Sequence, residues 1–151
     1  MEAALKEARN CGIDVPIGCV IVRNGEIIAR GRNVRETNND PLGHAELIAL
    51  RQAASALGSW RLNGCAVYCT LEPCPMCAEA ILQARVSKLI FGAYDNIYGA
   101  VGSAFNLYTK DRTFPLPDVL GGIAEEECKQ LVQEFFRQRR AEKQNGGRCI
   151  K

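Results

Sequence analysis

The sequence contains only one histidine among 151 residues, and no apolar run in it approaches the length of a membrane span. No membrane partner is therefore expected. The first residues, MEAALKEARN, include acidic side chains and lack a basic segment followed by an apolar one, which argues against a secretion signal or transit peptide. Internal repeats, linkers and low-complexity segments are also missing. With 47% hydrophobic and 24% charged residues, the composition indicates one ordinary globular domain.

Cysteine, by contrast, is abundant, with eight residues. A disulfide framework is one interpretation, but a chain of this length can bury a core without disulfides. Only Cys74 and Cys77 have the spacing of metal ligands. Reduced thiols indicate a reducing compartment, most simply the cytoplasm. Five other cysteines stand singly among apolar neighbours and are predicted to be small core residues: Cys11, Cys19, Cys65, Cys69 and Cys128.

The net charge of +2 is unevenly distributed along the chain. Residues 137–151 contain six Lys or Arg against one Glu, a net charge of +5 that leaves −3 for residues 1–136. Such an end is either a solvated tail or a binding surface for nucleic-acid phosphates, and charge alone favours the solvated tail. We expect one folded domain over residues 1–142 and a basic polar tail over 143–151.

The order of the predicted helices and strands indicates the fold class. Residues 33–42 are a polar loop, and residues 93–123 have a weak pattern with one short helix expected near 104–109. A hairpin followed by alternating helices and strands predicts an α/β domain with helices on both faces of a mixed sheet. The predicted helices are 2–11, 43–57, 74–84 and 124–142, and the predicted strands are 17–23, 26–32, 65–70 and 88–92, the first two joined by the hairpin signal Asn24-Gly25.

The single histidine lies in Gly43-His44-Ala45-Glu46, and the one Cys-x-x-Cys pair lies downstream in Glu72-Pro73-Cys74-Pro75-Met76-Cys77. Taken alone, a lone histidine is usually incidental, and a Cys-x-x-Cys pair is ambiguous between a redox couple and half of a metal site. The prolines suit the opening of a helix, whose N-terminus favours the thiolates that a metal requires. Two thiolates and one imidazole suit zinc and disfavour magnesium or calcium.

Three protein ligands leave the fourth position of tetrahedral zinc for water, which is typical of a catalytic rather than a structural site. The metal would lower the pKa of that water toward neutrality. Glu46 is either a solvated acid in the first turn of a helix or a proton shuttle beside the metal and outside its coordination shell. The combination of His-x-Glu with Pro-Cys-x-x-Cys is the recognised signature of zinc-dependent nucleobase deaminases.

Over nearly its whole length the sequence resembles the bacterial-type tRNA-specific adenosine deaminases of the cytidine and deoxycytidylate deaminase superfamily, which act on the wobble adenosine of an anticodon. The resemblance implies a cytidine-deaminase-like three-layer fold, with a central mixed sheet of about five strands and helices on both faces. It also implies a homodimer and one Zn²⁺ per chain. It rests on VPIGCVIV, GHAELIAL, GSWRLNGCAVYCTLEPCPMCAEAI, LIFGAYD, GAVGSAFNL and the closing FFRQRR.

The resemblance also implies roles for individual residues. Four of them form the reaction centre: zinc is bound by His44, Cys74 and Cys77, and Glu46 shuttles protons. Five others would bind substrate: Asn33 at the target base or its ribose, Asp95 near the flanking nucleotide, and Phe135, Phe136 and Arg140 on a final helix that touches RNA.

The sequence departs from the family in two places. Leu42-Gly43 stands where the family often has Thr-Ala, which changes little chemically. Residues 114–117, Phe-Pro-Leu-Pro, replace a frequent Phe-Asn-His and carry no histidine. An RNA contact made by that histidine is therefore not expected in this chain.

These observations predict a tRNA adenosine(34) deaminase, a hydrolase of the C–N bond of a cyclic amidine, with the tRNA anticodon arm as partner. Anticodon bases are splayed and cost little to extrude. Two alternatives stay open. A guanine or cytosine deaminase acting on a free base would share the chemistry, but it would need no basic FFRQRR end. A non-catalytic zinc and RNA-binding module would need neither a three-ligand site nor Glu46.

Overall fold

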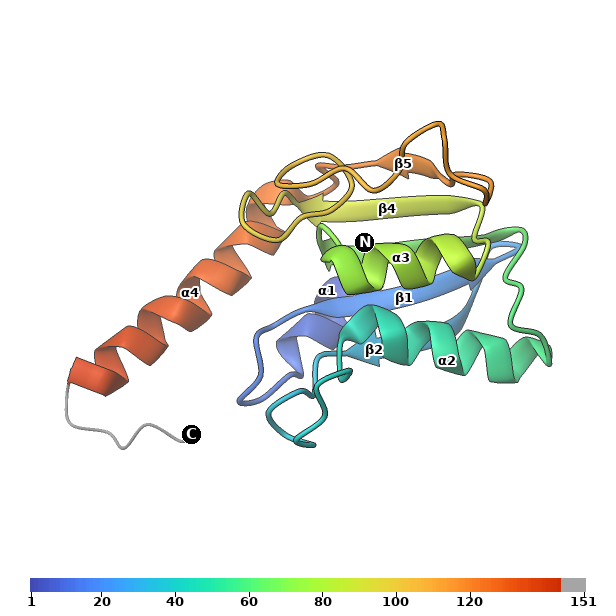
Figure 1. Cartoon of the computed structure of the whole chain (residues 1–151). Helices are drawn as coiled ribbons and strands as arrows, with labels where there is room; N and C mark the ends of the chain where they lie inside the picture. The colour runs from blue at the N-terminus through green and yellow to red at the C-terminus, as the bar shows by residue number, and fades with distance from the viewer. Residues whose placement is uncertain (145–151) are drawn as a thin grey trace.

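Five strands form one mixed sheet in the order β2-β1-β3-β4-β5 (Figure 1). The computed structural model describes residues 1–144. The mixed sheet of about five strands that the family resemblance implies is confirmed; its fifth strand lies within residues 93–123, where the residue pattern predicted none. The strands are β1 (Gly18–Arg23), β2 (Glu26–Arg32), β3 (Cys65–Leu71), β4 (Lys88–Ala93) and β5 (Asp118–Leu120), and the helices are α1 (Glu2–Arg9), α2 (Ala45–Leu57), α3 (Pro75–Gln83) and α4 (Glu125–Gln144).

The first half of the sheet is antiparallel. Strand β1 pairs with β2 on one side and with β3 on the other. Asn24 and Gly25, which join β1 to β2, have positive φ angles of 51° and 81°. A two-residue hairpin loop in a type I′ turn requires positive φ at both central residues. Asn and Gly adopt positive φ readily, which explains why Asn-Gly is so strong a hairpin signal. The predicted hairpin is therefore confirmed.

The second half of the sheet is parallel, with β3 beside β4 and β4 beside β5. Because parallel strands point the same way, β3 and β4 end at the same edge of the sheet. The chain leaves β3 into Glu72, Pro73 and Cys74, and it leaves β4 into the loop that begins at Tyr94. The carboxyl edge of parallel strands is where open α/β sheets place their ligands.

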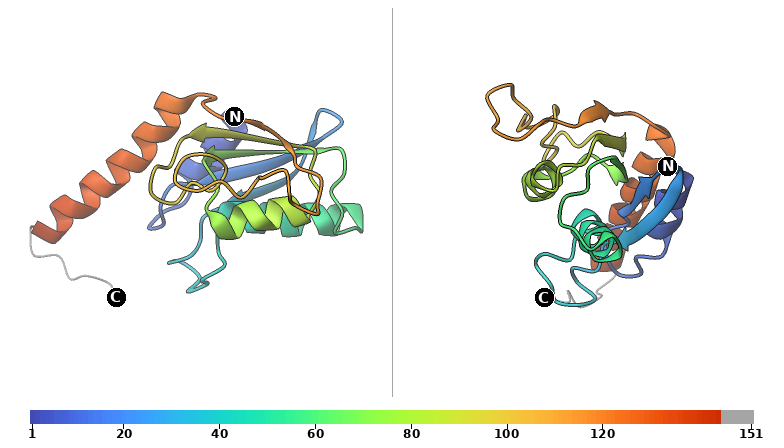
Figure 2. Two further views of the ribbon diagram at one scale, coloured as in Figure 1. Left: turned by 45° about the horizontal axis from the view of Figure 1, so that its top comes forward. Right: turned by 90° about the vertical axis from the view of Figure 1, so that its right-hand side faces the viewer.

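Helices cover both faces of the sheet, as predicted: α2 and α3 lie on one face, and α1 and α4 lie on the other (Figure 2). On the first face, Ala49 of α2 and Ile81 of α3 pack against Ile21 of β1 in the main core. On the second face, Leu5 of α1 and Cys128 of α4 pack against Ala93. The five cysteines predicted to be core residues are all buried.

Glycine at position 31 lets α2 approach the sheet directly. A Cβ atom there would lie 2.1 Å from the carbonyl oxygen of Ala45, in the first turn of α2. Any side chain would push the helix away, because two heavy atoms cannot approach so closely. The contact therefore holds the start of α2, and His44 before it, against the sheet.

The structure differs from the sequence predictions mainly at ends and in loops. Helix α2 begins at Ala45 rather than Gly43, because His44 has an extended backbone (φ −80°, ψ 143°) and caps the helix. No helix forms near 104–109; Val101 and Asn106 instead make an isolated bridge. None of the helices within residues 1–144 is long and apolar enough to cross a membrane. Most of the predicted basic tail, residues 145–151 with Cys149, lies outside the described residues.

Candidate metal centre

Three side chains from two helix N-termini converge at the carboxyl edge of the sheet. His44 caps α2, Cys74 caps α3, and Cys77 lies in the first turn of α3. Their ligand atoms all lie within 4.8 Å of one another. Pro75 opens α3 at a position where its missing N–H removes no helical hydrogen bond, as the sequence indicated. Residues 30 positions apart in the chain thus form one cluster.

The spacing of these atoms fits a zinc ion. His44 Nδ1 lies 3.7 Å from Cys74 Sγ and 3.4 Å from Cys77 Sγ. Tetrahedral zinc, with Zn–S near 2.3 Å and Zn–N near 2.0–2.1 Å, sets the nitrogen–sulfur separation at about 3.6 Å. The two separations bracket that value. The donor set and these two separations therefore fit a tetrahedral zinc site.

The electrostatics of the cluster favour a thiolate. A hydrogen bond from the Cys77 thiol, aided by one from His44, lowers the pKa of Cys74 to about 4, although burial opposes the shift. The same Cys74 contact raises the pKa of His44. At Cys19, in contrast, burial raises the pKa of the thiol well above its usual value. Since the thiolate is the metal-binding form, Cys74 is prepared for a cation and Cys19 is not.

Glu46 lies in the first turn of α2, two residues after His44. It is 4% exposed, so the interpretation of Glu46 as a solvated surface acid is wrong. Burial raises the pKa of its carboxyl group, and a backbone N–H opposes that rise. A carboxyl group whose pKa is raised by burial, next to a metal-binding cluster, has the position of a proton shuttle.

The structure places the two predicted substrate residues of the loops in hydrogen-bonded turns. Asn33 is buried; its amide donates to the carbonyl of Val15 at 3.1 Å and accepts from the Arg35 N–H at 3.4 Å. Asp95 accepts from the N–H groups of Ile97 and Tyr98 at 2.9 and 3.0 Å. Both side chains are held in fixed positions, and their contacts with substrate remain predictions.

The predicted RNA-contact residues of α4 lie apart from the cluster. Only Cys128 of this helix is buried, and beyond its first turns the helix extends away from the sheet (Figure 1). The rings of Phe135 and Phe136 meet edge to face with centroids 5.4 Å apart. Phe136 and Arg140 are exposed. These side chains are accessible to a large partner, and the structure does not bring them to His44, Cys74 or Cys77.

Two buried carboxylates near the centre carry no sequence prediction. Asp14 accepts from the Glu36 N–H at 2.6 Å and from the Thr37 N–H at 3.1 Å, and so holds the loop that precedes His44. Glu72 accepts backbone N–H groups from the loop after β4. Glu72 stands next to the Pro-Cys-x-x-Cys motif, but no local pattern shows that its carboxylate is buried. For Asp14 we find no signal in the sequence.

Comparison with known proteins matches both the sequence and the fold. The family model for the cytidine and deoxycytidylate deaminase zinc-binding region matches residues 1–93. A tRNA-specific adenosine deaminase of Bacillus subtilis is 46% identical over 145 residues, covering 95% of this chain and 90% of the relative. One of Agrobacterium fabrum is 45% identical over 142 residues, covering 93% of each. A solved tRNA:A34 deaminase, studied for A-to-I editing at the wobble position, superposes with a TM-score of 0.83 at 45% identity, covering 87% of this chain and 96% of that one.

Proposed function

The chain belongs to the cytidine and deoxycytidylate deaminase family, among the tRNA-specific adenosine deaminases, and from this we propose that it converts the wobble adenosine of tRNA anticodons to inosine. One water molecule is consumed and one ammonia is released as a carbonyl oxygen replaces the exocyclic amine. The observation that carries the proposal is the cluster of His44, Cys74 and Cys77 with Glu46 buried beside it.

We propose that His44 Nδ1 and the thiolates of Cys74 and Cys77 hold one zinc ion per chain and leave one coordination position open. The ion, when bound, supplies Lewis acidity that makes a water molecule nucleophilic near neutral pH. The two helix N-termini that present Cys74 and His44 add positive potential, which favours the thiolate of Cys74.

Glu46 is proposed to move the protons of the reaction. Its carboxylate carries both protons of the attacking water in turn: the first goes to the ring nitrogen, and the second, from the hydroxyl group left by the attack, goes to the leaving amine. The burial of Glu46, two residues after His44, supports this role. Because Glu46 is held in the first turn of α2, directly after His44 and Ala45, one short segment positions both a metal ligand and the acid–base group.

The proposed substrate is an RNA loop rather than a free base. Phe136 and Arg140 are exposed on α4, where an aromatic ring can stack on an unpaired base and a guanidinium can bind phosphate. A small molecule entering a closed pocket would use neither group. The three-ligand geometry and the buried Glu46 likewise support catalysis over a purely structural zinc module.

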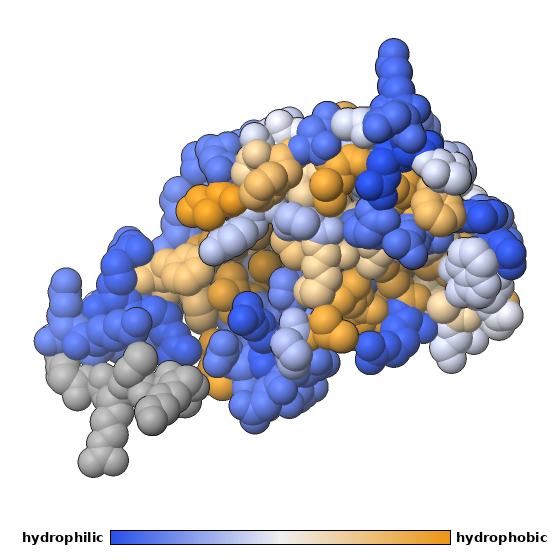
Figure 3. Space-filling model, in the orientation of Figure 1, coloured by the Kyte–Doolittle hydropathy of each residue, from blue (hydrophilic) through white to orange (hydrophobic). Residues whose placement is uncertain are grey.

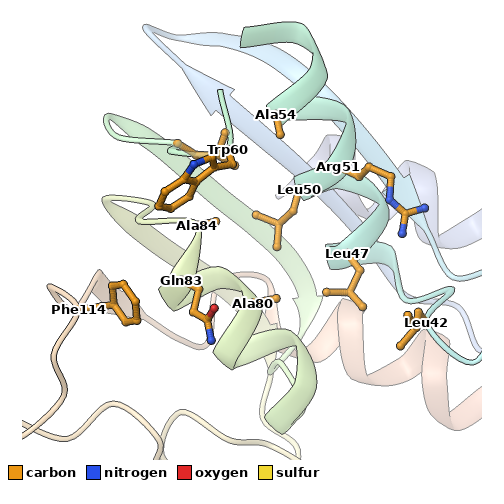
Figure 4. A pocket seen from close by; sticks show the side chains of 11 residues that line it. Leu42, Leu47, Leu50, Arg51, Ala54, Trp60, Ala80, Gln83, Ala84 and Phe114 are labelled. Atoms are coloured by element: carbon orange, nitrogen blue, oxygen red, sulfur yellow. The ribbon is translucent and has the colours of Figure 1, made fainter. Parts of the chain in front are cut away.

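A homodimer is the second part of the proposal. An apolar groove of about 460 Å³ runs between α2 and α3, and Figure 3 shows apolar surface over these helices. Leu47 and Leu50 of α2 face Ala80 of α3 across it, with Trp60 and Phe114 toward one end and Leu42 at the other (Figure 4). Exposed apolar surface of this kind marks interaction sites. A second copy of the chain, as the family resemblance implies, is the proposed occupant.

Sedimentation of the purified protein tests the dimer. The parent should sediment at twice the chain mass, and a Leu42→Lys/Trp60→Lys variant, which places two charges in the groove, should sediment as a monomer. Ile27→Lys/Val119→Lys is the matched control, because these side chains are exposed and lie outside the groove. A monomeric parent, or a groove variant that stays dimeric, contradicts this part of the proposal.

We also propose where the deaminase domain ends. Helix α4 continues to Gln144, so we place the end of the deaminase domain at the end of this helix, close to the predicted residue 142.

Within residues 1–144 all seven cysteines are free thiols. Free thiols and a tRNA substrate support a cytoplasmic location.

The function is tested with a transcribed tRNA that carries adenosine at the wobble position. Incubation with the zinc-loaded protein should produce inosine, detected by nucleoside mass spectrometry, and the same tRNA with guanosine at that position should give none. Free adenine, guanine and cytosine are assayed in parallel. Faster turnover of a free base than of the tRNA would replace the proposed substrate and leave only the deaminase chemistry.

A further inference from the structure

Glu72 is a carboxylate that is 2% exposed and forms no ion pair within residues 1–144. Its Oε2 accepts the Asp95 N–H at 3.1 Å. Its Oε1 accepts the N–H groups of Val101 and Ser103 at 3.2 and 3.1 Å. A carboxylate has only acceptors, and burying one is costly unless it is hydrogen-bonded. Three backbone donors from one loop satisfy this requirement.

The loop that supplies these donors is tied to the turn that carries Cys74. Beyond the side-chain contacts, the Ala100 N–H donates to the carbonyl of Pro73 at 2.8 Å. The Glu72 N–H donates in turn to the carbonyl of Ala93 at 2.8 Å, where the loop begins. Side chain and backbone of the Glu72–Cys74 turn are therefore both bonded to the segment after β4.

Gly99 shows how closely the loop passes over the carboxylate. A Cβ atom at this position would lie 2.4 Å from Glu72 Oε2 and 2.4 Å from the carbonyl oxygen of Asp95. Only glycine fits, because the loop crosses the carboxylate with its backbone. The close approach is independent evidence that residues 95–103 are shaped around Glu72.

The segment held in this way exposes a distinctive surface. Ile97 is 71% exposed and Tyr98 is 62% exposed, although both side chains are apolar or aromatic. Asp95 fixes their backbone by accepting both of their N–H groups. An exposed aromatic ring on a constrained turn can stack on an unpaired base, and the turn begins two residues after β4 ends at the edge that holds the metal centre.

We propose that Glu72 is a positioning residue: it fixes the 95–103 loop against the Cys74 turn and so sets where Asp95 and Tyr98 meet the nucleotide beside the target adenosine. This inference rests on the proposed RNA substrate. Glu72 acts through the loop and touches neither substrate nor metal. Its loss should therefore weaken RNA binding while the metal ligands and Glu46 continue to work.

The test replaces Glu72 by glutamine, which keeps the shape but turns one acceptor into a donor that faces a backbone N–H. Amide hydrogen exchange should accelerate at Asp95, Val101 and Ser103. The KM for an anticodon stem-loop RNA should rise about tenfold, as expected when a charge-assisted hydrogen bond is lost. Zinc content should be unchanged, and kcat should fall less than about threefold. Glu26→Gln, an exposed carboxylate in the hairpin, is the charge-matched control.

Gly99→Ala gives the same test with the carboxylate intact, since the added methyl group would clash with Glu72 Oε2 and push the loop away from it. It should reproduce the rise in KM and the faster exchange. Unchanged exchange in both variants, or faster exchange with an unchanged KM, overturns the inference. If the parent protein forms no inosine in the stem-loop, the proposed function is rejected instead.

Discussion

At the candidate metal centre the functional side chains are buried or half-buried and held by neighbours, whereas on the distal half of α4 most of them are exposed and held by one helix. Glu46 is 4% exposed, and Phe136 is 45% exposed. His44 and Cys74 are fixed by two helix starts that meet at one edge of the sheet. The distal turns of α4 extend away from the sheet instead (Figure 1).

The contrast agrees with the role proposed for each region. Moving protons at a metal requires fixed distances and exclusion of bulk water, which only a buried site provides. Binding a large polyanion requires cations and aromatic rings that the partner can reach. Changes at the centre should therefore alter the chemical step, and changes on α4 should alter RNA affinity and its salt dependence.

The largest effect is expected from removing metal ligands. A His44→Ala/Cys74→Ala variant should lose zinc and all measurable deamination, because it leaves one protein ligand of three. Elemental analysis of the parent should give about one zinc per chain. Cys128→Ala, at a buried cysteine outside the cluster, is the control and should keep its metal. Zinc retained by the double variant would show that the metal is bound elsewhere.

Replacing Glu46 by glutamine should slow the chemical step of deamination without loss of bound zinc. Turnover is expected to fall by roughly 10²-fold or more, the size typical of a positioned acid–base group, with zinc content and fold unchanged. Single-turnover inosine formation measures the chemical step directly. Glu79→Gln, the same change at the half-buried partner of Arg112 on α3, should leave that rate unaltered. Loss of zinc in the Glu46 variant would mean that this residue is a ligand.

Neutralising Arg137, Arg139 and Arg140 should weaken binding of an anticodon stem-loop without affecting single-turnover chemistry. Each lost phosphate contact removes about 0.7–0.9 from the slope of log affinity against log salt. Arg137 and Arg139 already have acidic partners, Glu134 at 3.2 Å and Glu142 at 3.8 Å. Arg140 has none within residues 1–144, so its single replacement should have the largest effect.

Three charges removed on the body of the molecule provide the control for this experiment. Arg23→Gln, Arg30→Gln and Lys88→Gln together change the net charge equally, at exposed positions away from α4. The RNA affinity of this control variant should depend on salt concentration almost as steeply as that of the parent. If the α4 variant binds as tightly as the parent at every salt concentration, the arginines only solubilise the helix and the comparison fails.

The smallest effect is expected on the free energy of unfolding. It again compares an exposed side chain of α4 with a buried one near the sheet. Phe136→Ala should change the free energy of unfolding by less than about 0.5 kcal/mol, as an exposed substitution does, while it weakens RNA binding. Ile81→Ala, at a fully buried position of α3, should cost about 2–5 kcal/mol. Urea unfolding with matched slopes measures both. A large loss of stability for Phe136→Ala would assign this ring to the core.

Local sequence was sufficient for the elements with strong periodicity or a specific turn. Asn24-Gly25 predicted the hairpin, because few residue pairs adopt positive φ twice in succession. The cysteine and histidine motifs predicted the ligand cluster, because donor type and spacing are local properties of the chain. The expected helix near 104–109 was wrong: the segment lies in a loop whose backbone bonds reach back to Gly99 and Ala100.

The sequence by itself determined the chemistry of this protein: which atoms can bind zinc, which carboxyl group stands next to them, and where the basic residues are. Only the tertiary structure decided which carboxylates are buried and which loops their hydrogen bonds hold in place. Asp14 and Glu72 look like ordinary surface acids in the sequence, yet each is closed off from water by a distant loop. Burial depends on contacts between residues 22 to 31 positions apart, and no local pattern of residues encodes such contacts.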